Sequence, residues 1–525
     1  MERRVLVAIA LSFLVLLVWF KLFPPPKPEE AREPAAIQEV QEPAEIQVTE
    51  TTAPETPAPR ADAPEIPAEP MPIVEGLPGQ ETILSNERVA FSIDSRGAAI
   101  RHIRLEHHQT NKGQPVDLLP HLPLHLEFQD HEDLTKLIEE APFQMVQSKG
   151  RVEYTFGNGT VWIHRTYALE GDFLSFEVEV KGVPEDSWAL TLGPVLRELD
   201  ESEAKSKFIQ VAQFVAFESE KPERTASKKL KEKLTIQQPR GAYYGLDGRY
   251  FSAIIFPESE LASIQAVAVE DEVKVTFLPK GNTFTGNLFA GGKRYDQLLS
   301  MDSRLAALID FGMFSFIAKP MLWMLNWLHS HGTNYGLAII ILTLIIRIIL
   351  FPLTHKQLKS MKAMQKLQPK IERLKTKYKK HKTDPDERAK MNQEMMELYR
   401  EEGVNPLGGC LPLLVQLPIL WAFYMLLSTA IELRHAPFFL WIVDLSAPDP
   451  FYVTPILMGA AMLIQQIMTP TAGSASQRKM FLIMPIVFTF VFLGFPSGLV
   501  LYWLTNNVFQ IMQTVVYQHL EKKEA

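Results

Sequence analysis

Arg347 lies in the middle of a strongly apolar stretch, Ile345-Ile346-Arg347-Ile348-Ile349. A charge at the centre of a membrane-spanning helix costs at least about 2.5 kcal/mol on insertion scales, so the charge needs a compensating environment. The apolar segments of the chain contain no carboxylate, and Glu432 and Asp449 fall just beyond segment ends. We therefore predict that Arg347 faces a water-filled cavity inside the membrane.

Polar side chains in the apolar segments suggest what lines that cavity. Such side chains serve as interhelical hydrogen-bonding groups, or together they line a hydrophilic groove, open to the cytoplasm, that holds a polar or acidic segment in transit. For Arg347 itself the alternative is snorkelling, because it lies about six residues, roughly 9 Å, from the cytoplasmic end of its segment. The sequence leaves these alternatives open. The polar residues are Thr343, which lies one turn from Arg347, Gln416, Gln465, Gln466, Asn506 and Asn507.

Catalytic and metal-binding motifs are missing from the sequence. The chain contains no HExxH, GxSxG or P-loop motif, and its single cysteine, Cys410, excludes an intrachain disulfide. Ser497 lies in a tight turn, but no apolar segment holds a histidine to activate it. The net charge of -8 gives no sign of nucleic-acid binding. We expect neither an enzyme nor a bound cofactor or metal, and no recognition of a nucleic-acid sequence.

Six apolar segments would carry these residues. The first, Val5 to Phe20, follows Arg3 and Arg4, and the absence of a small-x-small cleavage site favours an uncleaved anchor over a signal peptide. The other five are long enough to cross a bilayer as helices. They are Tyr335 to Leu353, Leu411 to Ala430, Phe451 to Thr469, Met480 to Phe495 and Leu499 to Tyr517.

Charge in the connecting loops predicts the orientation. The loop from Thr354 to Glu402 holds 14 Lys and Arg against 8 Asp and Glu. Arg478 and Lys479 lie between the fourth and the fifth of the six segments. The positive-inside rule places these loops and both termini in the cytoplasm. The long region between the first two segments then lies outside the cytoplasm, so the chain is expected to be a multi-pass inner-membrane protein.

The extracytoplasmic region divides into three parts by composition. Residues 24–78 are rich in Pro, Glu and Ala, which is typical of a disordered linker. Residues 79–300 contain short β-branched and aromatic runs separated by Gly, Pro and Asn, which predicts a large antiparallel β-sandwich of two sheets. Residues 301–330 place Trp323 and Trp327 at helical spacing, which predicts an amphipathic helix on the membrane surface or a core helix of the β domain.

The cytoplasmic loop, residues 355–403, has helical periodicity in two runs. Asp384-Pro385-Asp386-Glu387 is a good helix start, with Asp384 as N-cap, and Gly403 is a natural stop. We predict a helical hairpin. Its methionines would pack the hairpin or offer an adaptable surface to hydrophobic clients, and its lysines would meet solvent, anionic lipid or ribosomal RNA.

Four ordered strings lie in the second half of the chain: Gln393-Glu394-Met395-Met396, Asn405-Pro406-Leu407-Gly408-Gly409-Cys410-Leu411-Pro412, Leu445-Ser446-Ala447-Pro448-Asp449-Pro450 and Phe495-Pro496-Ser497-Gly498-Leu499. With these strings the chain resembles the YidC-type membrane protein insertases of Gram-negative bacteria. The resemblance is close over residues 335–517 and looser elsewhere. It implies a bacterial inner-membrane location, an insertase core of five spans, a groove centred on Arg347, and a hairpin needed for client delivery.

The resemblance also implies site residues and partners. Gln465, Trp503 and Asn506 would contribute to the groove, and Leu417, Pro418 and Phe492 would contact client helices. Partners would be nascent inner-membrane proteins, the Sec translocon, the ribosome and membrane lipids.

The expected architecture is an α-helical polytopic membrane protein of six transmembrane helices with a periplasmic β-sandwich. The expected function is insertion, folding and assembly of inner-membrane proteins, alone or with the Sec translocon. A transporter for a small anion would use the same polar cavity, and an anchored periplasmic binding protein would explain the β domain alone. The expected parts are an anchor (1–23), linker (24–78), β domain (79–300), interfacial helix (301–330), second span (331–354), hairpin (355–403), four spans (404–517) and a cytoplasmic tail (518–525).

Overall fold

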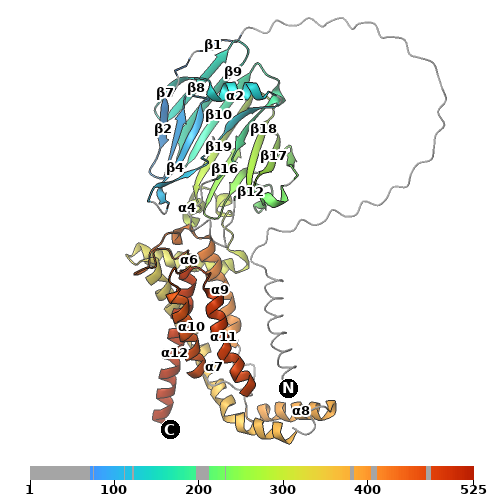
Figure 1. Cartoon of the computed structure of the whole chain (residues 1–525), viewed down its shortest axis with the longest axis vertical. Helices are drawn as coiled ribbons and strands as arrows, with labels where there is room; N and C mark the ends of the chain where they lie inside the picture. The colour runs from blue at the N-terminus through green and yellow to red at the C-terminus, as the bar shows by residue number, and fades with distance from the viewer. Residues whose placement is uncertain are drawn as a thin grey trace, which may run out of the picture.

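The computed structural model describes residues 71–524, except 75, 78, 111–112, 121–122, 130, 197–211, 231, 379–383, 404–410 and 469–474. The predicted anchor, nearly all of the predicted linker, and Cys410 lie outside the described residues. Figure 1 shows two bodies, a β domain and a bundle of helices.

The β domain consists of antiparallel strands in three hydrogen-bonded sheets. A ten-stranded sheet has the order β1-β8-β9-β10-β19-β16-β15-β12-β13, with β7 paired to β8. The four-stranded sheet β2-β3-β4-β5 packs over β9 and β19, and the five-stranded sheet β14-β17-β18-β11-β6 packs over β12 and β15. The predicted antiparallel sandwich is confirmed, but its second layer is two sheets where a single one was expected.

The strand bounds follow the chain as β1 (Ile73–Val74), β2 (Glu81–Ser85), β3 (Val89–Asp94), β4 (Ala99–Gln109), β5 (Pro115–Leu118), β6 (His125–Phe128), β7 (Gln144–Ser148), β8 (Arg151–Asn158), β9 (Trp162–Glu170), β10 (Phe173–Lys181), β11 (Trp188–Leu192), β12 (Gln213–Phe217), β13 (Glu223–Thr225), β14 (Leu234–Gln237), β15 (Tyr243–Asp247), β16 (Phe251–Pro257), β17 (Leu261–Val269), β18 (Glu272–Pro279) and β19 (Thr283–Gly292). A short helix, α2 (Glu132–Glu140), follows β6.

Strand β10 shows why these sequences form a sandwich. Its alternate residues Leu174, Phe176, Val178 and Val180 are buried in the core, while Glu177 between them is exposed. This two-residue period puts one apolar face against the facing layer.

A buried charge cluster ties three strands of the large sheet together. The Asp247 carboxylate is 2.9 Å from Lys293 Nζ and 2.7 Å from Arg224 Nε, and it accepts a 2.6 Å hydrogen bond from Ser252 Oγ. Burial alone would raise the pKa of Asp247, but Lys293 and Arg224 outweigh burial and hold the pKa below its usual value. Arg224 also donates to the Leu308 carbonyl at 2.8 Å, so the cluster reaches the segment that follows the β domain.

That connecting segment is broken where one helix was expected. It forms α4 (Tyr295–Met301), α5 (Ser303–Ala306), a 3-10 turn (Gly312–Phe314) and α6 (Ser315–Ser330). The α6 helix is amphipathic, with Trp323 58% and Trp327 46% exposed and an opposite face that packs on α7 and α9. This packing argues against the alternative of a β-domain core helix, and Figure 1 shows α6 at the end of the bundle that faces the β domain.

Helices occur at all five positions predicted from the apolar segments after residue 330. Within the described residues, one of them, α7, is long and apolar enough to cross a membrane by length and composition. Shorter apolar helical stretches are Val415–Thr429, Val453–Met468 and Leu482–Phe492. The helices are α7 (Tyr335–Lys377), α8 (Pro385–Glu401), α9 (Leu411–Thr429), α10 (Val453–Met468), α11 (Ala475–Phe492) and α12 (Ser497–Glu524).

The α7 helix continues through the boundary predicted at residue 354. It runs for 43 residues, with Pro352 and Pro369 inside it, and its last turns form the first arm of the predicted hairpin. The second arm, α8, packs on it through a small apolar cluster. Asp384 is the N-cap and accepts from the Asp386 amide at 3.0 Å. The cluster consists of Met364, Leu367 and Ile371 with Met395, Leu398 and Tyr399.

Candidate functional site at Arg347

Arg347 is bound by α12, which runs parallel to α7. One guanidinium nitrogen donates to the Gln510 side-chain oxygen and the other donates to the Asn506 backbone carbonyl at 3.0 Å. The buried Nε has no hydrogen-bond partner. Among the described residues no carboxylate forms an ion pair with this guanidinium, so its positive charge is met by neutral groups alone.

The facing side of α12 carries a polar stripe at intervals of three and four residues. Asn506, Asn507, Gln510 and Thr514 are all buried, with exposed fractions of 7%, 4%, 7% and 2%. One turn beyond Gln510, Gln513 donates to Thr354 of α7 at 2.7 Å. The polar contacts between α12 and α7 therefore extend from the level of Arg347 to that of Thr354.

The next three predicted groove residues lie on α9, on α10 and on α7 itself. Gln416 of α9 donates to the hydroxyl of Tyr502 on α12, and Gln465 is half-buried on α10, which packs against α12. Thr343 is buried, and its hydroxyl donates to the Ile339 carbonyl of its own helix at 2.7 Å. The structure thus brings Arg347 and Asn506 into direct contact, while Thr343 bonds within α7.

Trp503 joins the polar stripe to an aromatic cluster. Its ring centroid lies 6.2 Å from that of Phe488 and 5.6 Å from that of Phe492, and its buried indole N–H has no hydrogen-bond partner. The side-chain nitrogen of Asn507 is likewise buried without a partner. Two buried donors of α12, on Trp503 and Asn507, are therefore without a partner among the described residues.

The predicted client-contact residues differ in exposure. Leu417 and Pro418 of α9 are half-buried. Phe492 is only 5% exposed, within the aromatic cluster, whereas Phe490 on the same helix is 70% exposed. In this conformation Phe490, with Ile483 and Ile486, forms the outward surface of α11.

Sequence reasoning missed Gln510, the side chain that binds Arg347. The signal was present, because Gln510 lies four residues after Asn506 and four before Thr514, on one helical face. Tyr502 and Gln513 were missed too.

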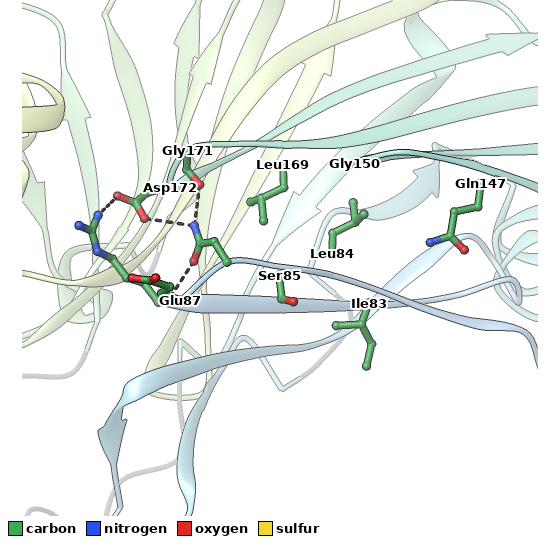
Figure 2. Close-up of a pocket in the computed structure, with 11 residues that line it drawn as sticks. Ile83, Leu84, Ser85, Glu87, Gln147, Gly150, Leu169, Gly171 and Asp172 are labelled. Carbon is green, nitrogen blue, oxygen red and sulfur yellow. Dashed lines mark hydrogen bonds and ion pairs between the residues drawn. The ribbon is translucent and has the colours of Figure 1, made fainter.

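The cavities of the β domain involve none of these residues. A pocket of about 610 Å³ lies beside the β2–β3 turn and the β9–β10 turn, and Figure 2 shows the residues that line it. Asn86 Nδ2 donates to the Gly171 carbonyl at 2.6 Å, and Arg88 pairs with Asp172. The polar groups at this end of the pocket thus bind one another.

Comparison with known proteins finds matches to one family over nearly the whole chain. The family model for the YidC periplasmic domain matches residues 82–324, and the model for the 60Kd inner membrane protein matches residues 327–524. The membrane protein insertase YidC of Geotalea daltonii is 36% identical over 98% of each chain, and that of Syntrophus aciditrophicus is 34% identical over 98% of each.

A crystal structure of an active YidC insertase with its first transmembrane domain resolved is also similar. It has 22% identity and a TM-score of 0.39, with 86% of this chain and 95% of that chain covered. The family assignment rests on sequence: because 36% identity extends over 98% of both chains, this chain belongs to the family of the membrane protein insertase YidC.

Proposed function

We propose that the chain inserts and helps to fold nascent inner-membrane proteins. The polar or acidic part of a client enters a hydrophilic groove beside Arg347, open to the cytoplasm, and its apolar helix passes along α9 and α11 into lipid. The observation that carries this proposal is the Arg347 guanidinium, which lies inside the apolar part of α7 and has only neutral partners among the described residues.

The charge of Arg347 explains the preference for an acidic client. Carbonyl oxygens accept its hydrogen bonds but leave the net charge in place, and the effective dielectric constant inside a bilayer protein is low. A client carboxylate that reached the unpartnered Nε would form a charge-assisted hydrogen bond. Passage needs no nucleotide, because burial of the client's apolar side chains in lipid supplies the free energy.

The proposed topology has six spans, formed by the segment in residues 1–23 and by α7, α9, α10, α11 and α12. The cluster of basic residues in the second half of α7 supports a cytoplasmic hairpin, and the β domain then lies in the periplasm. The hairpin would receive clients from the ribosome, and the insertase would act alone or beside the Sec translocon. Surrounding lipid would receive the released helix.

Site-specific photocrosslinking tests the route of the client. A photoreactive residue replaces Arg347, Leu417, Trp503 or Phe490, and the client is a nascent single-span protein with a short acidic tail. Ile349, which is 70% exposed on α7, serves as the control position on the same helix. We expect crosslinks to the tail from 347 and 503 and to the apolar helix from 417 and 490. Crosslinks no stronger than those from position 349 would overturn the proposed route.

Substitution of Arg347 tests the role of its charge. Arg347→Ala is expected to reduce insertion of the acidic-tailed client in reconstituted vesicles, and Arg347→Lys is expected to retain most of it, because a lysine keeps the charge. A client with a neutral tail is the control. If Arg347→Ala inserts the acidic client normally while the crosslinks remain, the polarity of the groove matters and its charge does not.

A further inference from the structure

The connection between α9 and α10 carries an exposed apolar surface. Phe439, Leu440, Val443 and Phe451 are 67%, 71%, 70% and 66% exposed. We call residues 437–452 the apolar loop. Clustered exposed side chains of this kind mark an interaction surface.

The apolar loop turns its charged groups inward. Residues 437–452 include two charged side chains, Asp444 and Asp449. Asp449 is 1% exposed and accepts from Trp441 Nε1 at 3.0 Å and from the amide and hydroxyl of Thr454 at 2.8 Å each. Asp444 accepts from the amides of His435 and Ser446 at 3.1 Å and 2.8 Å. The outer surface of the loop is therefore left to apolar side chains.

The loop has a fixed shape that presents those side chains. The Trp441 and Phe451 rings pack edge to face at 6.3 Å between centroids, which joins its two halves. Leu440 has a φ of 53°, in the left-handed region, and costs about 1–3 kcal/mol there. The Phe438 amide donates to the Ile442 carbonyl at 2.9 Å and the Ile442 amide donates to the Phe439 carbonyl at 3.1 Å. These two bonds close the turn, so the strain is retained and Leu440 points outward.

Contacts with α7 place the loop at the membrane boundary. Asn334, the N-cap of α7, donates to the Phe438 carbonyl at 3.1 Å, and a Cβ built on Gly336 would lie 2.0 Å from the Phe438 ring. Phe438 therefore packs on the first turn of α7, the helix long and apolar enough to span the bilayer. The exposed Ile456 and Leu457 of α10 continue the apolar surface away from the loop.

We propose that the apolar loop inserts into the periplasmic leaflet of the inner membrane, at the boundary between headgroups and acyl chains. Aromatic side chains prefer this depth in the bilayer, and the loop can enter it without burying an exposed charge. The Ser497 amide donates to the Ala447 carbonyl at 2.7 Å and the Gly498 amide donates to the Leu445 carbonyl at 3.0 Å. Anchoring the loop thus fixes the depth at which α12 begins.

Spin-label accessibility in lipid tests this inference. The full chain carries Cys410→Ser and a single nitroxide-labelled cysteine at position 439, 443 or 451, in vesicles of phosphatidylethanolamine and phosphatidylglycerol. Collision of the label with oxygen, which concentrates in lipid, is compared with collision with a water-soluble nickel chelate. The control is a label at Val146, which is 57% exposed on the β domain. All four side chains are largely exposed, so their replacement leaves no cavity in the core.

We expect the oxygen-to-nickel ratio at the three loop positions to exceed that at position 146 several-fold. Nickel access equal to that at position 146 would show the loop in water and overturn the inference. Shielding from both reagents would show a protein covering the loop and would overturn it equally. The inference rests on the inner-membrane location and on α7, so the result is independent of whether clients pass Arg347.

Discussion

At the scale of single residues, Arg347 is stabilised by dipoles. The Gln510 side-chain oxygen and the Asn506 carbonyl each bear a partial negative charge, and neither cancels the charge of the guanidinium. The Arg347 Nε, the Asn507 side-chain nitrogen and the Trp503 indole nitrogen are each buried without a hydrogen-bond partner. Each unsatisfied buried donor costs about 1–3 kcal/mol.

Gln510→Leu tests the contribution of this partner. Loss of a hydrogen bond to a charged group costs about 1.5–3 kcal/mol, so we expect insertion of an acidic-tailed client to fall by roughly tenfold. Combination with Arg347→Ala should cause little further loss, because the two side chains act as one unit. Insertion into reconstituted vesicles measures both effects. Gln513→Leu, which removes the partner of Thr354, is the control, and an equal loss from it would contradict a specific role for Gln510.

Asp247 contributes to the stability of the β domain through its buried ion pairs. Asp247→Asn would leave Lys293 and Arg224 with buried positive charge, and we expect the free energy of unfolding to fall by about 3–5 kcal/mol. Chemical unfolding of the full chain in detergent measures this change. Asp271→Asn, in an exposed turn, is the matched control and should change stability little.

The same carboxylate predicts a dependence on acid. Because Lys293 and Arg224 hold the pKa of Asp247 below its unfolded value, the folded state binds fewer protons than the unfolded state. Its stabilising contribution is complete above the unfolded pKa of about 3.9 and is lost as the pH falls through the lower folded pKa. Unfolding titrations between pH 6 and pH 3 should therefore show less loss of stability in Asp247→Asn than in the native chain.

At the scale of elements, α10 and α11 approach closely because Gly459 has no side chain. A Cβ built there would lie 1.9 Å from the Thr489 hydroxyl oxygen, which itself donates to the Pro485 carbonyl at 2.8 Å. Small residues permit such backbone approach in membrane helices, where packing replaces the hydrophobic effect as the driving force. The position of the exposed surface of α11 thus depends on one glycine of α10.

Gly459→Leu is expected to separate the two helices and to weaken insertion of clients that pass along α11. Disulfide crosslinking between cysteines placed on α10 and α11 in a Cys410→Ser chain would measure the separation. Ala460→Leu adds the same side chain at the next position, which is exposed. Equal effects of the two substitutions would show that added bulk, and not the α10–α11 contact, is responsible.

The sequence predicted the positions of these helices better than their continuity. Hydropathy separated a span ending near residue 354 from a cytoplasmic hairpin, because it reports the environment of side chains. The backbone passes through Thr354 without a break, and the Thr354 hydroxyl bonds the carbonyls of Leu350 and Phe351. Arg347 was identifiable by its chemistry alone. Its partner Gln510 is 163 residues away, and the register of α7 against α12 cannot be read from one chain.

At the scale of the whole molecule, the β domain is joined to the bundle by direct contacts. Arg249, in the β15–β16 turn, donates to the Ser428 carbonyl at the end of α9 at 2.6 Å. Arg434, beyond α9, donates to the Gln109 carbonyl at the end of β4 at 3.0 Å. The β domain donates one of these bonds and the segment after α9 donates the other, so the β domain restrains the adjacent end of α9.

Arg249→Ala should loosen this junction. We expect a broader distribution of distances between spin labels on the β domain and on α9, measured by double electron–electron resonance. Thermal unfolding of each part should change little, because Arg249 lies outside both cores. Arg240→Ala, at an exposed position of the β domain, is the control. An unchanged distribution in Arg249→Ala would show that other contacts hold the domain.

Because α7 is unbroken, the number of residues between Arg347 and the hairpin fixes the direction in which the hairpin points around the helix axis relative to Arg347. An α-helix turns by about 100° and rises by about 1.5 Å per residue, so inserting a single residue between Arg347 and Met364 would swing the hairpin a quarter-turn or more around the axis. Insertion of seven residues would nearly restore its direction at a greater depth. An insertion or deletion in α7 therefore moves the hairpin relative to Arg347, whereas a substitution leaves their relative direction unchanged. For this reason we expect α7 to tolerate substitutions far better than changes in the number of its residues.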